Sequence, residues 1–172
     1  MKVVQNFELE RYLGTWYEAY RSKAFRYGTG ECVTADYSMR PDGYIKVFNS
    51  EMKYLPDKKT LDTSKRNFKE GWAYWVNPEK KEATLGVKFS IFQPWYATYN
   101  VMDTDYDTYA YIYSGSPGGW FGIGRYQLCW VLTRKPLSKD SEELKDIHDR
   151  AKNFLEAEIP GFNFDEAMRH TL

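Results

Sequence analysis

Apolar and polar residues alternate along most of this chain. Between residues 14 and 135 the sequence divides into segments of about 8 to 12 residues, rich in Tyr, Trp, Val and Thr and separated by turn-forming residues. The turn Asp42-Gly43 supplies the positive-φ chemistry of a tight hairpin. This pattern predicts eight β-strands, at 14–21, 32–40, 44–52, 67–76, 82–92, 95–102, 108–114 and 124–134.

Each predicted strand has one apolar face and one polar face. The clearest apolar faces are Val33, Ala35, Tyr37 and Met39, then Leu85, Val87, Phe89 and Ile91, and then Tyr126, Leu128, Trp130 and Leu132. The parity turns Cys32 and Cys129 outward. Eight strands with short links favour an all-β, antiparallel up-and-down barrel, because closure removes exposed edges. A barrel of eight strands has room for one small ligand.

One α-helix is expected after the barrel, over about 140–158. Asp140 and Glu143 fit a capping box, apolar residues recur at helical spacing, and Pro160-Gly161 ends the pattern. We expect this helix to pack on the outside of the barrel. The candidates to lie beneath it are Cys129, Val131, Tyr109, Tyr111 and Tyr113. Residues 160–172 are expected to form an irregular tail, and the length predicts a single domain over 1–172.

Charge and composition exclude several classes of partner. The 24 Lys and Arg balance the 24 Asp and Glu, so no overall field attracts nucleic acid. The mean hydropathy is −0.68, and no apolar run approaches the roughly 20 residues of a membrane helix. Aromatic residues make up 18% of the chain, which is its strongest compositional signal.

The first residues lack the apolar core of a secretory signal, so either the protein is cytosolic with a native Met1 or a leader is absent from this chain.

The sequence contains no pattern typical of a catalytic or metal-binding site. The glycine-rich segment 115–124 has neither the dinucleotide-binding nor the P-loop pattern. His148 and His170 fall on the predicted outer helix and in the tail, and the spacing of the two cysteines matches no zinc site. Glu18 has inward parity, and a buried carboxylate there would have a raised pKa in a hydrogen-bonded structural role. We therefore expect no enzyme activity, no cofactor and no metal.

Three ordered motifs resemble those of a known family. They are Gly14–Glu18 at the first strand, Thr104-Asp105-Tyr106 between the sixth and seventh strands, and Arg134 after the eighth. In order and spacing they resemble the signatures of the lipocalins. The segments 12–18, 35–38, 42–47 and 130–134 are most similar to the branch of apolipoprotein D and bacterial lipocalin, and 104–110 also looks like retinol-binding proteins.

The resemblance implies which end of the barrel is closed. Gly14, Trp16, Thr104, Asp105, Tyr106 and Arg134 would meet at one rim, with Arg134 lying over the Trp16 ring in a structural cation–π contact. The opposite rim is then the mouth. Its links contain Phe25, Tyr27, Tyr54, Leu55, Phe92, Trp95, Tyr96, Trp120 and Phe121, with the basic Lys58, Lys59, Lys65 and Arg66. These rings either cover one another as a plug, form a lip for a ligand, or face a membrane.

The function implied is binding and transport of a small hydrophobic or amphipathic molecule, such as a fatty acid or a lysophospholipid. Strand parity nominates the residues of the pocket: Tyr20, Ala35, Tyr37, Ile45, Val47, Asn49, Ala73, Trp75, Val87, Phe89, Tyr99, Val101, Ala110, Ile112, Leu128 and Trp130. Asn49 and Glu51 are candidates to meet a polar headgroup. The alternative is a nearly filled barrel that acts as a protein or membrane interaction module through its aromatic mouth.

Weak membrane contact through the mouth and a homodimer stay open as further partners. Family members often join the start of the second strand to a cysteine in the tail, but residues 162–172 contain none, so we expect two free thiols. The resemblance implies a secreted, periplasmic or membrane-surface location.

Overall fold

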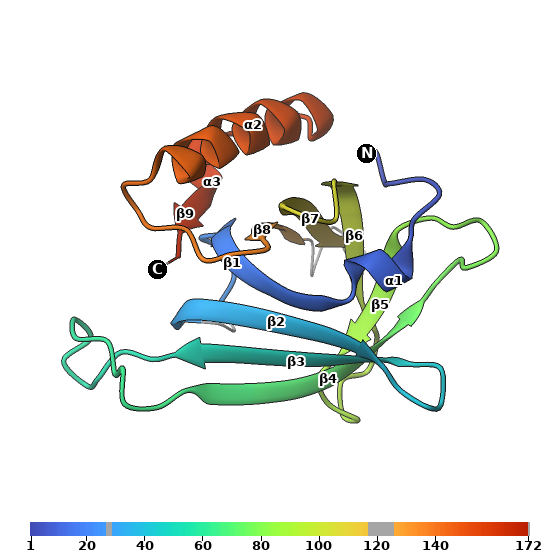
Figure 1. The fold of residues 1–172 in the computed structure, drawn as a ribbon, viewed down its shortest axis with the longest axis horizontal. Coiled ribbons are helices and arrows are strands. Elements are labelled where there is room, and N and C mark those ends of the chain that lie inside the picture. The colour runs from blue at the N-terminus through green and yellow to red at the C-terminus, as the bar shows by residue number, and fades with distance from the viewer. Residues whose placement is uncertain (27–28, 117–125, 172) are drawn as a thin grey trace.

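Eight antiparallel strands close into a barrel (Figure 1), which confirms the predicted fold. The computed structural model describes residues 1–26, 29–116 and 126–171. Each strand pairs with the next in sequence, and β1 pairs with both β8 and β2, which completes the ring. The strands are β1 Gly14–Ser22, β2 Glu31–Met39, β3 Ile45–Met52, β4 Asn67–Trp75, β5 Thr84–Lys88, β6 Ala97–Thr104, β7 Tyr109–Ser116 and β8 Tyr126–Thr133.

Helix α2, Glu142–Glu158, lies across the outside of the barrel above β1, β7 and β8 (Figure 1). Its cap differs from the predicted one: the Ser141 side chain, not that of Asp140, accepts a hydrogen bond from the backbone of Leu144. Four apolar residues of one helical stripe are buried, Leu144, Ile147, Ala151 and Leu155. They pack with Cys129, Val131, Tyr111, Tyr109 and Tyr113, all of which were expected beneath this helix.

The prediction of an irregular tail was wrong. The tail forms α3, Phe164–Ala167, and β9, Met168–His170, and β9 pairs with Tyr20–Ser22 of β1. Strand β1 pairs with β2 only over Gly14–Tyr17, so its remaining edge would otherwise lack backbone partners. A short helix that the sequence did not predict, α1 at Leu9–Tyr12, precedes β1. None of the described helices is long and apolar enough to cross a membrane.

Two local irregularities correct the predicted strand faces. The pairing of β1 with β8 shifts register between Glu18 and Tyr20, which inverts the parity of the rest of β1. Tyr20 therefore lies outside the barrel, against His148, Phe164 and His170, and the prediction that it lines the interior was wrong. Strand β5 ends at Lys88 rather than at residue 92, so Ile91, which was predicted to lie on the apolar face of this strand, is instead 78% exposed.

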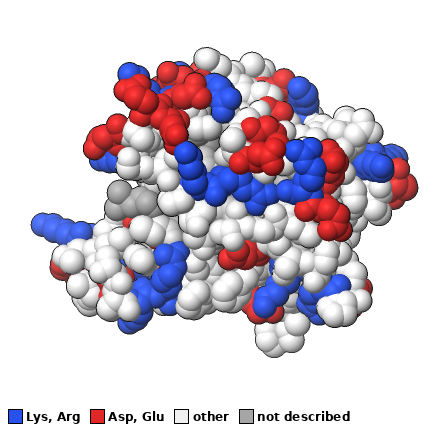
Figure 2. Space-filling view, in the orientation of Figure 1, with Lys and Arg blue, Asp and Glu red and all other residues white. Residues whose placement is uncertain are grey.

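The buried side chains form two cores separated by the barrel wall. The inner core fills part of the barrel, and the outer core lies between the wall and α2, α3 and β9. On the outside, Figure 2 shows Lys and Arg intermixed with Asp and Glu over one face of the molecule, in line with the zero net charge. Function therefore has to be sought in the barrel and at its rims.

Candidate ligand-binding site

The structure places most of the predicted pocket residues on the inner face of the barrel. Those in the inner core are Ala35, Tyr37, Ile45, Val47, Ala73, Trp75, Val87, Phe89, Tyr99, Val101, Ala110, Ile112 and Trp130. Asn49 shares this face because it pairs with Ala35, and Leu128 shares it because it lies two residues before Trp130. Contact of these residues with a ligand stays a prediction.

The inward-facing side chains differ in how far they are shielded from solvent. Ile45, Ala73, Val101, Ala110 and Ile112 are fully buried. In contrast, Ala35, Phe89, Leu128 and Trp130 are only partly buried although they face inward. Solvent therefore reaches part of the inner wall, where an apolar ligand would displace it.

The closed end is held by Arg134, whose guanidinium lies 3.7 Å from the centre of the Trp16 ring. Its Nε donates to the Tyr106 carbonyl at 2.8 Å, Nη1 to Thr15 at 3.0 Å and Nη2 to Arg11 at 2.8 Å. Thr104 and Asp105 shape the neighbouring turn, in which Asp105 accepts from the backbones of Asp107, Thr108 and Tyr109. This network ties α1, β1, the β6–β7 turn and the end of β8 together.

Above this end, three tyrosine hydroxyls meet inside the barrel. The Tyr12 and Tyr99 oxygens are 2.7 Å apart, and the Tyr37 hydroxyl donates to Tyr99 at 3.0 Å. Burial raises the pKa of Tyr37 to about 12, so it is neutral at physiological pH. Tyr12 comes from α1, and strand periodicity could not place it there. The three rings form an apolar floor whose polar atoms are paired.

Toward the mouth, the inner wall carries charge. Glu18 of β1 is buried, with 7% of its side chain exposed, and its Oε1 lies 3.4 Å from Arg21 Nη1. Burial raises the pKa of Glu18 to about 7, although Arg21 and Arg169 oppose the shift. Arg21 faces inward only because of the irregularity in β1, and Arg169 arrives on β9, where it contacts Glu31 at 2.8 Å. Sequence periodicity missed both arginines.

The mouth carries exposed aromatic and aliphatic side chains. In the link between β5 and β6, Ile91, Phe92 and Trp95 are 78%, 88% and 67% exposed. Phe25, from the link between β1 and β2, instead packs edge-on against Trp130 at 5.3 Å between ring centres. The predicted mouth residues Tyr27, Trp120 and Phe121 lie outside the described residues. At the rim, the Phe25 ring therefore packs against the inner wall, whereas the apolar side chains of the β5–β6 link face solvent.

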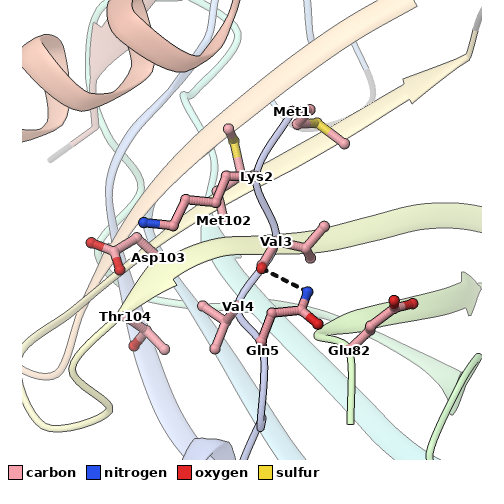
Figure 3. A pocket seen from close by; sticks show the side chains of 9 residues that line it. All are labelled: Met1, Lys2, Val3, Val4, Gln5, Glu82, Met102, Asp103 and Thr104. Carbon is pink, nitrogen blue, oxygen red and sulfur yellow. Dashed lines mark hydrogen bonds between the residues drawn. The ribbon is translucent and has the colours of Figure 1, made fainter. Parts of the chain in front are cut away.

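A separate hollow lies on the outer surface and is distinct from the barrel interior. It has a volume of about 610 Å³ and is lined by Met1, Lys2, Val3, Val4, Gln5, Glu82, Met102, Asp103 and Thr104 (Figure 3). Its walls are the N-terminal segment and one edge of β6, and the Lys2 side chain extends toward Asp103. An open, partly charged groove of this kind suits an apolar chain less well than the barrel does. None of the residues that strand parity nominated lies in it.

The sequence that forms this barrel, its outer helix and the Trp16–Arg134 closure matches a known family. Residues 7–154 match the family described as "Lipocalin-like domain". This chain belongs to the lipocalin family. It is 35% identical to apolipoprotein D of Rattus norvegicus over 134 residues, which are 78% of this chain and 64% of that protein. It is 36% identical to the outer membrane lipoprotein Blc of Escherichia coli K12 over 139 residues, or 80% of this chain and 68% of that one.

Solved structures show the same fold at lower identity. The lipocalin superposes on insecticyanin from the tobacco hornworm Manduca sexta with a TM-score of 0.75 and 18% identity, covering 100% of this chain and 84% of the other. For lobster apocrustacyanin A1 the TM-score is 0.64 and the identity 19%, covering 95% and 78%. The match to rat apolipoprotein D spans less than two thirds of that protein's length. Lipocalins bind small hydrophobic ligands, and this chain has the barrel in which they do so.

Proposed function

We propose that this lipocalin carries a lipid with one long apolar chain, such as a fatty acid or a lysophospholipid, inside its barrel. The observation that carries the proposal is the partly exposed inner wall formed by Ala35, Phe89, Leu128 and Trp130 above the buried tyrosine floor. Burying each methylene of a chain contributes about 0.8 kcal/mol before the costs of association. The protein acts as a carrier in this proposal, since no bond in the ligand has to change.

The test is a titration followed by tryptophan emission, with Trp130 and Trp75 as internal reporters. Fatty acid, lysophospholipid and retinoid are added separately, and micromolar or tighter binding of a chain lipid is expected. Ala35→Phe fills the inner wall and should weaken binding at least about tenfold. Ser38→Phe, on the exposed outer face of the same strand, is the matched control. Absence of any emission change or dye displacement would instead favour the filled-barrel interaction module.

Membrane contact is a second proposed property, and the exposed link between β5 and β6 supports it. Ile91, Phe92 and Trp95 project into solvent, and isolated domains rarely expose such a cluster without a partner. Two lysines flank it: Lys69 Nζ lies 5.1 Å from the centre of the Phe89 ring, and Lys88 Nζ lies 4.5 Å from that of Tyr96. An apolar loop beside cations suits the surface of an anionic bilayer. A carrier docked by its mouth would exchange lipid with that bilayer directly, at a membrane surface.

A further inference from the structure

One lysine stands on the inward face of the barrel at its mouth. Lys69 of β4 pairs with Asn49 of β3, two positions before Gly71, which pairs with the inner-core residue Val47. Every second position of a strand shares a face, so Lys69 faces inward as well. The end of β3 and the start of β4 lie at the end of the barrel away from α1 (Figure 1), and Lys69 is exposed there. A ligand at the mouth therefore meets this ammonium group.

The positive charge of Lys69 is not compensated by the protein. None of the ion pairs between described residues includes it, and Asn49, directly opposite, is neutral. The next carboxylate along this face of β3, Glu51, is engaged elsewhere. Its Oε1 lies 3.6 Å from Lys53 Nζ, and its Oε2 accepts from the Gly30 backbone at 3.1 Å. An anion supplied from outside would thus find a cation without a partner.

The arginines of the charged inner wall do not offer the same opportunity. The Arg21 side chain is 2% exposed, lies 3.4 Å from Glu18 and donates to a backbone carbonyl at 2.7 Å. Arg169 contacts Glu31 at 2.8 Å. Both guanidinium groups already have acceptors, and reaching Arg21 would require an anion to leave water. An anionic group is therefore better placed at Lys69.

Apolar surface adjoins the lysine on the same wall. Lys69 Nζ lies 5.1 Å from the centre of the Phe89 ring, and this ring packs against the inner core. The ring lies close to Gly71, where an added Cβ would come within 2.6 Å of the Phe89 Cδ1 atom. A glycine at this position leaves room for the ring against β4. The wall therefore presents an ammonium group at the rim and an apolar surface directly behind it, which matches a chain with a charged end.

We propose that Lys69 binds the headgroup of the carried lipid, so that the barrel prefers a single-chain carboxylate, a fatty acid, over a neutral lipid of the same chain length. The inference rests on the proposed carrier function and adds the charge of its ligand. One ammonium group balances one carboxylate, whereas a phosphate monoester carries about 1.5 to 2 negative charges at neutral pH. The acyl chain runs past Phe89 into the barrel, and the charged end stays at the exposed rim, where it need not be fully desolvated.

The experiment compares three lipids of one chain length by the tryptophan readout, without vesicles, at a pH of about 8, where a carboxyl group is ionised. They are myristate, 1-monomyristoylglycerol and 1-myristoyl lysophosphatidate. Myristate should bind at least about threefold more tightly than the monoacylglycerol, and added salt should reduce this preference. Lys69→Met should weaken myristate binding about threefold to tenfold and change monoacylglycerol binding less than about twofold, whereas Lys69→Arg should keep the preference.

Two further variants test the role of the charge. Asn49→Asp places a carboxylate opposite Lys69, and this internal partner should weaken myristate binding as much as Lys69→Met does. Lys46→Met is the matched control, because it removes an ammonium group that lies 5.3 Å from the Phe48 ring on the outer face of β3. Its effect on all three lipids should be less than about twofold. Melting temperatures of all variants are measured alongside.

The outcomes separate this inference from the carrier function. If Lys69→Met weakens all three lipids equally or weakens none of them, Lys69 does not recognise the headgroup, and the carrier proposal stands. Tighter, Lys69-dependent binding of the lysophosphatidate than of myristate would overturn the assignment of a carboxylate. An equal loss of myristate binding in Lys46→Met would show a general effect of net charge and would also overturn it. If none of the three lipids binds to the wild type, the carrier proposal itself falls.

Discussion

Arg134 joins segments of the chain that lie far apart in the sequence. Its planar group lies on the Trp16 ring and donates to carbonyls of Thr15, Tyr106 and Arg11. These acceptors belong to parts of the chain that are distant in sequence. Arginine suits this role because its fixed fork of donors can serve several oxygens at once.

Arg134→Ala is expected to lower the free energy of unfolding by about 2 to 3 kcal/mol. The loss combines the cation–π contact with carbonyls left without a donor. Because the residue lies at the closed end, ligand affinity should change less than about twofold. Urea denaturation and lipid titration measure the two quantities, with Arg134→Lys as an intermediate. A variant of full stability that no longer binds lipid would mean that the mouth has been assigned to the wrong end.

Glu18 is the residue whose charge state should matter most for stability. Its pKa rises from 4.5 to about 7 on folding, chiefly because burial penalises the carboxylate. Between these values the folded protein holds more protons than the unfolded chain, so stability falls as pH rises. Arg21, Arg169 and Glu31 face the carboxyl from β1, β9 and β2 and are included in that value.

Glu18→Gln should therefore flatten the pH dependence of stability between pH 4.5 and 7. Over this range the wild type is expected to lose up to about 3 kcal/mol relative to the variant. Denaturant unfolding at several pH values measures the difference, and His170, whose pKa burial lowers, is present in both proteins. Parallel curves for the two proteins would show that Glu18 ionises normally in the folded state.

At the scale of elements, α2 and β9 determine which parts of the barrel wall are accessible. Helix α2 covers Cys129, whose side chain is fully buried, and burial raises the pKa of its thiol to about 12. Cys32 lies at the irregular start of β2, with a φ of 51°, and is only partly buried. The two cysteines are both free, yet they experience different environments.

A thiol reagent should accordingly react with one cysteine per native chain and with two after denaturation. The fast site is Cys32, so Cys32→Ser should leave no fast reaction, whereas the slow Cys129 responds only when α2 is displaced. Absorbance of the released thiolate gives both counts under non-reducing conditions. Two fast thiols in the native wild type would place α2 away from the wall, and no thiol after denaturation would indicate a disulfide.

At the scale of the whole molecule, positive and negative side chains are intermixed on the surface (Figure 2), whereas the link between β5 and β6 at the mouth exposes Ile91, Phe92 and Trp95. The net charge of zero provides no general attraction to a bilayer, so contact has to come from the rim. The lysines near the loop each contribute about 1 kcal/mol at an anionic surface, and the expected attachment is weak and reversible.

Sedimentation with vesicles containing anionic lipid should show binding that decreases with salt. Changing Phe92 and Trp95 together to Ser should reduce the bound fraction severalfold, because both side chains would insert at the interface. Tyr44→Ser, in the turn between β2 and β3 at the closed end, removes a similarly solvent-facing ring and serves as control. Equal loss in the two variants would indicate general adhesion, and no binding by the wild type would end the membrane proposal.

The elements that depend on neighbouring residues could be predicted from the amino-acid order alone. Alternation predicted eight strands, the apolar stripe predicted α2, and the ordered motifs around Trp16, Tyr106 and Arg134 indicated the closed end. Parity also placed most of the inner wall correctly, because a regular strand turns every second side chain to one face. These features follow from local stereochemistry and from burial of one face.

Features that depend on pairing between distant segments could be recognised only in the assembled fold. The register shift in β1 turns Tyr20 outward and Arg21 inward. Strand β9 pairs with the part of β1 that β2 does not reach. An extra residue in a strand leaves little trace in composition, yet it inverts every position that follows. The charged wall around Glu18 therefore became visible only when β1, β2 and β9 were assembled.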